Sequence, residues 1–255
     1  MRTFAEERQQ RVLAELQQRG RVEVATLARE LAVSEDTVRR DLRALAAAGH
    51  LHKTHGGAVA LDTGHLSWAA RADVASDAKR AIAAAAVELV EPGDTVILDA
   101  GSTVLALAVA LAGSSSHRPL TVLTNSLDIA EVFTGAPDVT LHLTGGQWDA
   151  RSRFLVGPAA TAGIAGYRAD WAFLGTCALH PGAGATSVDP LDADVKRAMA
   201  AVAIRVAVLA DHTKHGTTAP HLVLSPDDLD VLVTDVAQAE QDWLDRATTV
   251  HVVRA

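Results

Sequence analysis

Cysteine is nearly absent from this sequence, and so is any long apolar run. Cys177 is the one cysteine in 255 residues, so an internal disulfide is excluded and a reducing compartment is favoured. The longest unbroken apolar run is Val104–Ala112, well short of the roughly 18 residues that a membrane-spanning helix needs. Residues 1–10 are charged and contain no apolar stretch typical of a secretory signal. We therefore expect a soluble, cytoplasmic protein.

Aromatic residues are also scarce, at 4% of the chain, whereas hydrophobic residues make up 49% and charged residues 21%. This composition excludes a wholly disordered or collagen-like chain. Because aromatics are few, the core must be built mainly from Ala, Val and Leu. The length favours two domains.

Charge is unevenly distributed along the chain, whose formal net charge is −8. Residues 1–60 hold ten Lys/Arg and eight Asp/Glu, a net +2, whereas the remaining residues hold 13 and 23, a net −10. A mildly basic head can approach a polyanion, and an acidic body is unsuited to it. We expect the two parts to have different functions.

Residues 1–57 are expected to form a first domain with three helices, at 4–18, at 25–31 and after an N-cap at Ser34. In the third helix Val38, Leu42 and Leu45 form a stripe that must face a core. The opposite surface carries Thr37, Arg39, Arg40 and Arg43. The short turn before Ser34 predicts a helix-turn-helix, whose second helix enters the DNA major groove. A solvated charged helix in a small helical domain is the alternative.

Residues 50–57 are expected to form a short hairpin, or wing. Lys53 and His55 are placed there to contact the DNA backbone. The nearby histidines could also be interpreted as a metal cluster, but no pair of them has the spacing of a zinc site. We predict no metal and no cofactor.

The head closely resembles the N-terminal domain of the DeoR family of bacterial transcriptional regulators. The resemblance rests on a long match with fixed spacings, which runs through Leu27–Leu31, Val33-Ser34, Thr37–Leu42 and His55–Ala58. It implies a winged helix-turn-helix that binds double-stranded operator DNA. It also implies DNA contacts from Ser34, Thr37, Arg39 and Arg40, while Asp41 is expected to pair with a neighbouring arginine.

Residues 58–76 are expected to be a linker, and residues 77–255 an α/β effector domain. Helical and strand patterns alternate there, with strands expected at 96–99, 120–124, 139–143, 169–174, 205–210, 231–234 and 250–253. Helices of about ten residues separate several of them, which predicts a largely parallel sheet.

Polar or glycine-rich segments follow four of these strands, where parallel sheets bind ligands. They are Asp99–Thr103, Thr124–Ser126, Gly145-Gly146 and Asp211–Lys214. A Gly-Ser-Thr turn at a helix N-terminus suits an anion, and Lys214 would add a positive charge. Each segment alone is more often a helix cap or a turn. No glycine pattern fits a dinucleotide fingerprint or a Walker loop.

The body also resembles the effector domain of the DeoR family, which is similar to ribose-5-phosphate isomerase. The matching strings include Gly93–Thr103, Thr124–Ser126, Val156–Pro158, Asp170–Gly175 and Leu209–Lys214. The resemblance implies a phosphorylated sugar or related effector, bound by a phosphate cradle and by sugar-side contacts. The cradle comprises Gly101, Ser102, Thr103 and Asn125, and the sugar-side residues are Gly145, Gly146, Asp211 and Lys214. The remaining candidate effector residues are Asp99, Thr124, Ser126, Gly175 and Asp192.

Three positions depart from the family pattern, at Ala178, Asp192 and His215. They suggest an unusual effector or altered specificity. Cys177 is expected to be a small buried apolar residue. The predicted function is a sugar-phosphate-responsive regulator, a repressor that binds DNA as a dimer or tetramer and is not an enzyme. The alternatives are an isomerase-like enzyme and a constitutive DNA-binding protein.

Overall fold

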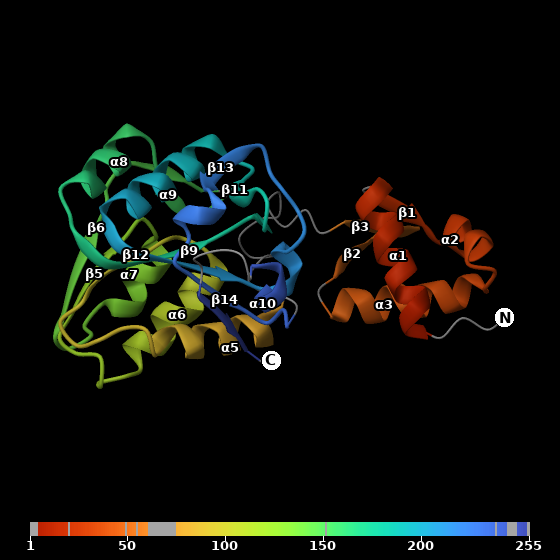
Figure 1. Ribbon diagram of the computed structural model, residues 1–255, viewed down its shortest axis with the longest axis horizontal. Helices are drawn as coiled ribbons and strands as arrows, with labels where there is room; N and C mark the ends of the chain where they lie inside the picture. Colours follow the sequence, from red (N-terminus) through yellow and green to blue (C-terminus); the bar gives the residue numbers. More distant parts are fainter. Residues whose placement is uncertain are drawn as a thin grey trace. The chain divides into compact units, whose positions relative to one another are not determined.

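The computed structural model describes residues 5–19, 21–48, 50–54, 56–60, 75–150, 152–237, 239–243 and 249–253. The chain divides into two compact units, Met1–Asp62 and Thr63–Ala255. Figure 1 labels the helices and strands of both units.

The first unit packs three helices against a small antiparallel sheet with strand order β1-β3-β2. Its elements are α1 (Ala5–Arg19), β1 (Arg21–Glu23), α2 (Val24–Glu30), α3 (Glu35–Ala47), β2 (Leu51–Thr54) and β3 (Gly57–Ala60). The predicted stripe of Val38, Leu42 and Leu45 is buried in its core. The winged helix-turn-helix is therefore confirmed.

The hairpin extends to Ala60, past its expected end, because β3 pairs with both β1 and β2. The first unit thus takes in residues that the sequence assigned to a linker, while residues 61–74 lie outside the described part of the chain.

The turn between α2 and α3 is tight because backbone and side-chain groups satisfy both helix ends. Ala32 adopts a left-handed φ of 53°. The amides of Ala32 and Val33 donate back to carbonyls of α2, at 3.3 and 3.1 Å, a pairing typical of helices that end in a left-handed residue. Ser34 then caps α3 by accepting the amide of Thr37 at 3.2 Å.

Asp41 fastens α3 to α1. Its carboxylate is buried and accepts bonds from Nε and Nη2 of Arg8, the second at 3.0 Å. Gln9 adds a longer contact at 3.4 Å. The expected pairing with a neighbouring arginine is therefore wrong. Asp41 shares the inward face of α3 with Leu42 and Leu45, so its partner comes from a distant helix.

The second unit is built around a seven-stranded sheet in which every pairing is parallel. The strand order is β15-β14-β12-β9-β4-β5-β6, and the predicted α/β class is confirmed. The strands are β4 (Thr95–Leu98), β5 (Leu120–Thr124), β6 (Val139–Leu143), β9 (Ala169–Gly175), β12 (Ala203–Ala210), β14 (Val231–Thr234) and β15 (Thr249–Val252).

Helices cover both faces of this sheet (Figure 1). Val96 and Leu98 pack toward α5 (Ser76–Val87), α6 (Ser102–Ala112) and α7 (Leu127–Phe133). Ile97 packs toward the other face, which α8 (Pro158–Ala165), α9 (Pro190–Val202) and α10 (Ala239–Asp242) cover. Because both faces are buried, the strands are nearly continuous apolar runs. No helix in the described ranges is long and apolar enough to cross a membrane.

Several short elements do not follow from the sequence pattern. A two-stranded sheet joins β7 (Gln147–Asp149) to β8 (Phe154–Val156). A three-stranded sheet has the order β10-β11-β13, formed by Ala178–His180, Gly184–Ser187 and His221–Leu224. A 3-10 turn, η1 (His212–Lys214), follows β12. These strands of three or four residues are stabilised by pairing across the chain, which no local periodicity reveals.

Replacing Asp41 with Ala should loosen the packing of α3 on α1, because Arg8 loses its carboxylate in a mostly buried setting. We expect a loss of roughly 2–3 kcal/mol, typical of a hydrogen bond to a charged group. Amide hydrogen exchange of the full chain should then quicken in both helices. Asp36→Ala is the matched control, because the Asp36–Arg40 pair is exposed and spans 3.9 Å. Equal exchange rates in the two variants would show that Arg8–Asp41 does not hold the helices together.

Candidate functional site

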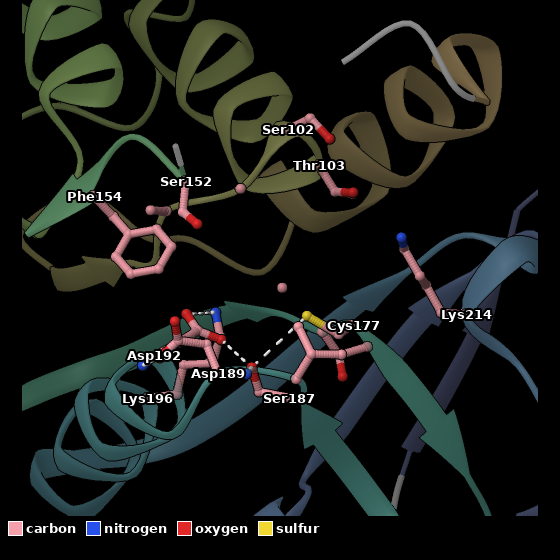
Figure 2. Close-up of a pocket in the computed structure, with 15 residues that line it drawn as sticks. Ser102, Thr103, Ser152, Phe154, Cys177, Ser187, Asp189, Asp192, Lys196 and Lys214 are labelled. Carbon is pink, nitrogen blue, oxygen red and sulfur yellow. Dashed lines mark hydrogen bonds and ion pairs between the residues drawn. The ribbon is translucent and has the colours of Figure 1, made fainter. Parts of the chain in front are cut away.

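A pocket of about 630 Å³, including its open mouth, lies at the carboxyl ends of the central strands (Figure 2). Segments at the ends of β4, β9, β11 and β12 contribute to it, together with the turn between β7 and β8 and the first turns of α9. The lining residues are Ala100, Gly101, Ser102, Thr103, Ser152, Phe154, Gly175, Thr176, Cys177, Ser187, Val188, Asp189, Asp192, Lys196 and Lys214. Ligand pockets are expected at this edge of a parallel sheet.

One wall of the pocket is the start of α6. Gly101, Ser102 and Thr103 line it, as the sequence predicts, and no described side chain caps this helix. The positive end of the helix dipole therefore faces the pocket, which favours an anion. In Figure 2, Ser102 and Thr103 lie across the pocket from Asp189, Asp192 and Lys196.

Asn125 supports this wall from behind. It is buried, and its Oδ1 accepts the amide of Ala100 at 2.9 Å. Its Nδ2 donates to the carbonyl of Leu155 at 3.4 Å. The side chain thus joins the loop after β4 to β8, and it does not line the pocket.

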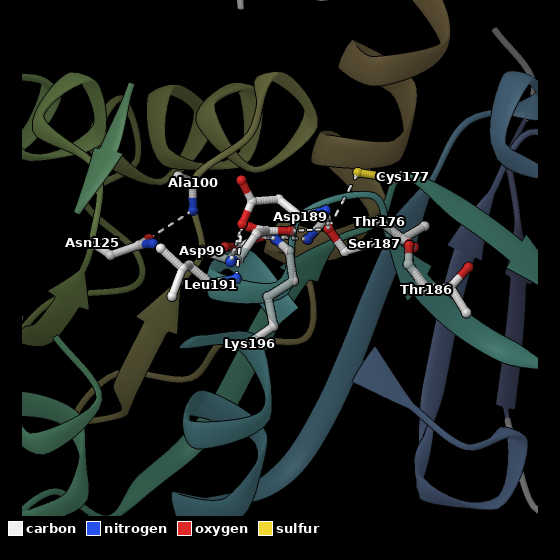
Figure 3. Close-up of polar contacts among 12 residues, drawn as sticks. Asp99, Ala100, Asn125, Thr176, Cys177, Thr186, Ser187, Asp189, Leu191 and Lys196 are labelled. Atoms are coloured by element: carbon white, nitrogen blue, oxygen red, sulfur yellow. Dashed lines mark hydrogen bonds and ion pairs between the residues drawn. The ribbon is translucent and has the colours of Figure 1, made fainter. Parts of the chain in front are cut away.

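A buried charge cluster lies at the floor, where Ser187, Asp192 and Lys196 line the pocket and Asp99 lies beneath them. The ammonium of Lys196 bonds to Asp99 Oδ2 and lies 3.3 Å from Asp192 Oδ1. Asp99 Oδ2 also accepts the amide of Gly175 at 3.0 Å, and Asp192 Oδ2 accepts the hydroxyl of Ser187 at 2.6 Å. We call Asp99, Asp192, Lys196 and Ser187 the floor cluster (Figure 3). With the two carboxylates ionised, its net charge is −1.

Burial shifts the proton equilibria of the floor cluster. Desolvation raises the pKa of Asp99 to about 6, against the attraction of Lys196. For Lys196, desolvation acts to lower the pKa, but the carboxylates of Asp192 and Asp99 outweigh it, so the pKa lies above its ordinary value. Lys196 therefore stays an ammonium at neutral pH.

Lys196 is the main feature that the sequence analysis missed. Asp192 and Lys196 are four residues apart on α9, a spacing that places both on one face of a helix. This signal was available. Pairing with Asp99, which lies 97 positions earlier, could not be read from it. Cys177, expected to be buried, is half-buried and lines the pocket, with its sulfur 3.8 Å from the hydroxyl of Ser187.

The turn after β12 brings Lys214 to the pocket but leaves Asp211 outside its lining. Asp211 is fully buried, and its Oδ1 accepts the amide of Thr213 at 3.0 Å, which caps η1. Among the described residues none donates to its Oδ2. His215 turns away from the pocket toward β14, where its Nε2 lies 2.9 Å from Thr234 Oγ1. Burial lowers the pKa of His215.

Four other predicted effector residues lie away from the pocket, at the ends of β5 and β6. Thr124 and Ser126 use their hydroxyls to accept amides at the start of α7. Gly145 and Gly146 have φ of 71° and 114°, in the left-handed region that favours glycine. A Cβ on Gly146 would lie 2.7 Å from the carbonyl oxygen of Val156. These residues shape the turns around the site.

In the first unit, the predicted DNA-contact residues of α3 gather on its outward face. Arg39, Arg40 and Arg43 are exposed, and the first two form helix-surface pairs with Glu35 and Asp36. Ser34 and Thr37 bond to one another at 2.9 Å at the start of the helix. Lys53 is exposed on β2. His55 lies outside the described residues.

Comparisons with known proteins match both units. Residues 8–64 match the family model of the DeoR-like helix-turn-helix domain, and residues 74–236 match that of the DeoR C terminal sensor domain. The chain is 35% identical over 248 residues to the HTH-type transcriptional repressor GlcR of Bacillus subtilis (strain 168), covering 95% of this chain and 94% of that protein. It is 34% identical over 233 residues to the transcriptional repressor AccR of Agrobacterium fabrum, covering 90% and 89%.

Solved structures similar to the chain include ribose 5-phosphate isomerase A from Methanocaldococcus jannaschii. The identity is 17% and the TM-score 0.42, over 55% of this chain and 54% of that one.

Replacing Lys196 with Met should destabilise the second unit by about 3–5 kcal/mol at pH 7.5, because two buried carboxylates then lack their counter-charge. Burial already raises the pKa of Asp99, and without the ammonium this pKa should rise further above its unfolded value. The stability that this carboxyl contributes is therefore fully present at low pH and is lost as the pH rises, so the loss caused by the substitution should shrink at pH 5. Urea denaturation followed by tryptophan fluorescence measures this, since all four tryptophans follow residue 62.

Arg197→Met is the control for this experiment. Arg197 is the next residue on α9, and its pair with Asp194 is about half exposed, so its loss should cost under about 1 kcal/mol at either pH. If both variants lost the same stability, Lys196 would have no special part in the floor.

Proposed function

Because the chain belongs to the DeoR family of transcriptional regulators, we propose that it represses transcription by binding operator DNA, and that a phosphorylated sugar in the pocket changes this binding. The observation that carries the proposal is the pocket itself. It combines a helix N-terminus and Lys214 with a floor of buried carboxylates.

The DNA-binding half of the proposal is supported by the outward face of α3. Its inward face is fully used by the core and by Arg8, so Arg39, Arg40 and Arg43 are left to the solvent. Arginine bonds bidentately to guanine edges and to phosphates. Lys53 and His55 on the wing are proposed to contact the DNA backbone.

The proposal that a phosphorylated sugar binds in the pocket is supported by its two different surfaces, one that favours an anion and one that offers hydrogen-bond acceptors. A phosphate suits the start of α6, where the helix dipole and Lys214 both favour negative charge. A sugar suits the rest of the pocket, since carboxylate oxygens of the floor cluster accept hydrogen bonds from hydroxyl groups. Gly101, Ser102, Thr103 and Lys214 are proposed to bind the phosphate.

Repression is proposed because the relatives GlcR and AccR are both named transcriptional repressors. The effector must bind two arrangements of the protein with different affinity in order to release DNA. A dimer or tetramer is proposed, since two-fold half-sites double the DNA contacts of one head.

A second candidate function is a sugar-phosphate isomerase. It is favoured by Asp99, a buried carboxyl whose raised pKa of about 6 suits general acid–base chemistry near neutral pH. A turnover assay with pentose and hexose phosphates distinguishes it from a regulator, which binds such compounds without converting them.

Arg40→Ala should weaken binding to the DNA upstream of the gene by roughly 10- to 100-fold, because one arginine contact to a base is worth about 1–3 kcal/mol. A mobility shift at fixed salt measures the change. Arg80→Ala is the matched control, since Arg80 is exposed on α5 of the second unit and the charge change is equal. Equal affinity of both variants would argue against α3 as the recognition helix.

Lys214→Ala should leave DNA binding intact but raise the effector concentration needed for release by about 10-fold or more, since a charge-assisted phosphate contact is lost. The same mobility shift, repeated with a panel of pentose and hexose phosphates, measures this. Arg197→Ala should respond as the unmodified chain does. A normal response of folded Lys214→Ala protein would remove this lysine from effector binding.

A further inference from the structure

An unpartnered carboxylate oxygen lies beneath the pocket floor. Asp99 is 0% exposed, and its Oδ2 is used by Lys196 and by the amide of Gly175. Its Oδ1 receives no hydrogen bond from any residue in the described part of the chain. A buried acceptor without a hydrogen bond lowers the stability of the folded protein by about 1–3 kcal/mol or more. Such acceptors are rare in native proteins, and one beside a pocket indicates a missing partner.

The residues around Asp99 line the pocket, whereas Asp99 itself lies behind them. Ala100, which follows it, and Gly175 and Lys196, which bond to it, all line the pocket. A Cβ on Gly175 would lie 3.5 Å from Asp99 Oδ2, an ordinary contact distance, so there is room for one more atom beside the carboxylate. In Figure 3, Asp99 lies between Asn125 on one side and Asp189 and Ser187 on the other.

The donors around the floor are already engaged by the protein. The hydroxyl of Ser187 donates to Asp192 at 2.6 Å, and that of Thr176 donates to the carbonyl of Ala178 at 2.7 Å. Lys196 binds both carboxylates of the floor cluster. The floor therefore offers acceptors and negative charge, which repel a phosphate and suit a hydrogen-bond donor.

We propose that Asp99 Oδ1 accepts a hydrogen bond from the effector, at the end of the effector opposite its phosphate. The phosphate binds at the start of α6 and at Lys214, and a hydroxyl or an ammonium group binds at the floor. Asp99 is then a specificity-determining residue, which selects phosphorylated polyols or amino sugars with a free donor at that carbon and rejects the deoxy compounds. This inference rests on the proposed function.

The test compares binding of matched ligands to the full chain by calorimetry. The probes are hexose 6-phosphates and pentose 5-phosphates, each with its monodeoxy analogues, and with the amino sugar phosphates. The unmodified protein should bind one parent compound at least ~100-fold more tightly than one of its deoxy analogues, because a buried acceptor left unpaired is strongly penalised. The amino sugars show whether the preferred donor is a hydroxyl or an ammonium.

Asp99→Asn changes this selectivity in a defined direction. Lys196 and Gly175 both donate to the Oδ2 position, so the carbonyl of the asparagine must face them and its NH₂ group must face the ligand. A donor then replaces the acceptor, and the ratio of parent to deoxy affinity should fall below about 10. If Asp99 has a purely structural role, the substitution should weaken the binding of the parent and deoxy compounds equally, and the ratio of their affinities should stay the same. Asp194→Asn, an equal charge change on the exposed face of α9, should keep the full ratio.

Gly175→Ala is the second variant, in case Asp99→Asn does not fold. Its added methyl group meets Asp99 at an ordinary contact distance and covers the carboxylate, so parent affinity should drop while binding of inorganic phosphate persists. The proposal is overturned if the unmodified protein does not distinguish parent from deoxy compounds, or if Asp99→Asn keeps the original ratio. If no phosphorylated compound binds at all, inorganic phosphate included, the proposed function fails and this inference fails with it.

Discussion

The pocket of the second unit depends on the ion pairs that the buried ammonium of Lys196 forms with two carboxylates. This ammonium lies between Asp99, at the end of β4, and Asp192, on α9. Two carboxylates this deep in the protein would repel each other without it, and at least one would be neutralised. One cation thus holds a helix of one face against the end of a central strand. Because two carboxylates share one ammonium, the floor keeps a net negative charge, which disfavours an anion there.

The topology of the sheet brings this cluster together. The order β12-β9-β4 places three strands side by side whose ends, Ala210, Gly175 and Leu98, are far apart in the chain. All three point the same way, so their following loops meet at one edge. Gly175, on the middle strand, donates its amide to Asp99 and has no side chain beside that carboxylate.

The first unit also contains a buried ion pair that joins two distant elements. Asp41 turns inward on α3 and is bound by Arg8 of α1, so the orientation of α3 about its axis is set by a buried acid–base pair as well as by its apolar stripe. The arginines of α3 are consequently directed outward. In each unit a buried charged contact fixes a helix to a distant element of the same unit.

Local sequence alone determined the two-part organisation, the helix-turn-helix and the parallel α/β class. The strands Leu120–Thr124 and Val231–Thr234 have the bounds that the sequence predicts, because strands buried on both faces are short, nearly continuous apolar runs. Gly101, Ser102, Thr103 and Lys214 were likewise found from their place at strand ends. Only the tertiary structure decided that Lys196 joins Asp99, that Asn125 supports a loop, and that Arg8 is the partner of Asp41. Each of these depends on which distant strands and helices become neighbours and where their side chains point, and short-range periodicity does not encode either.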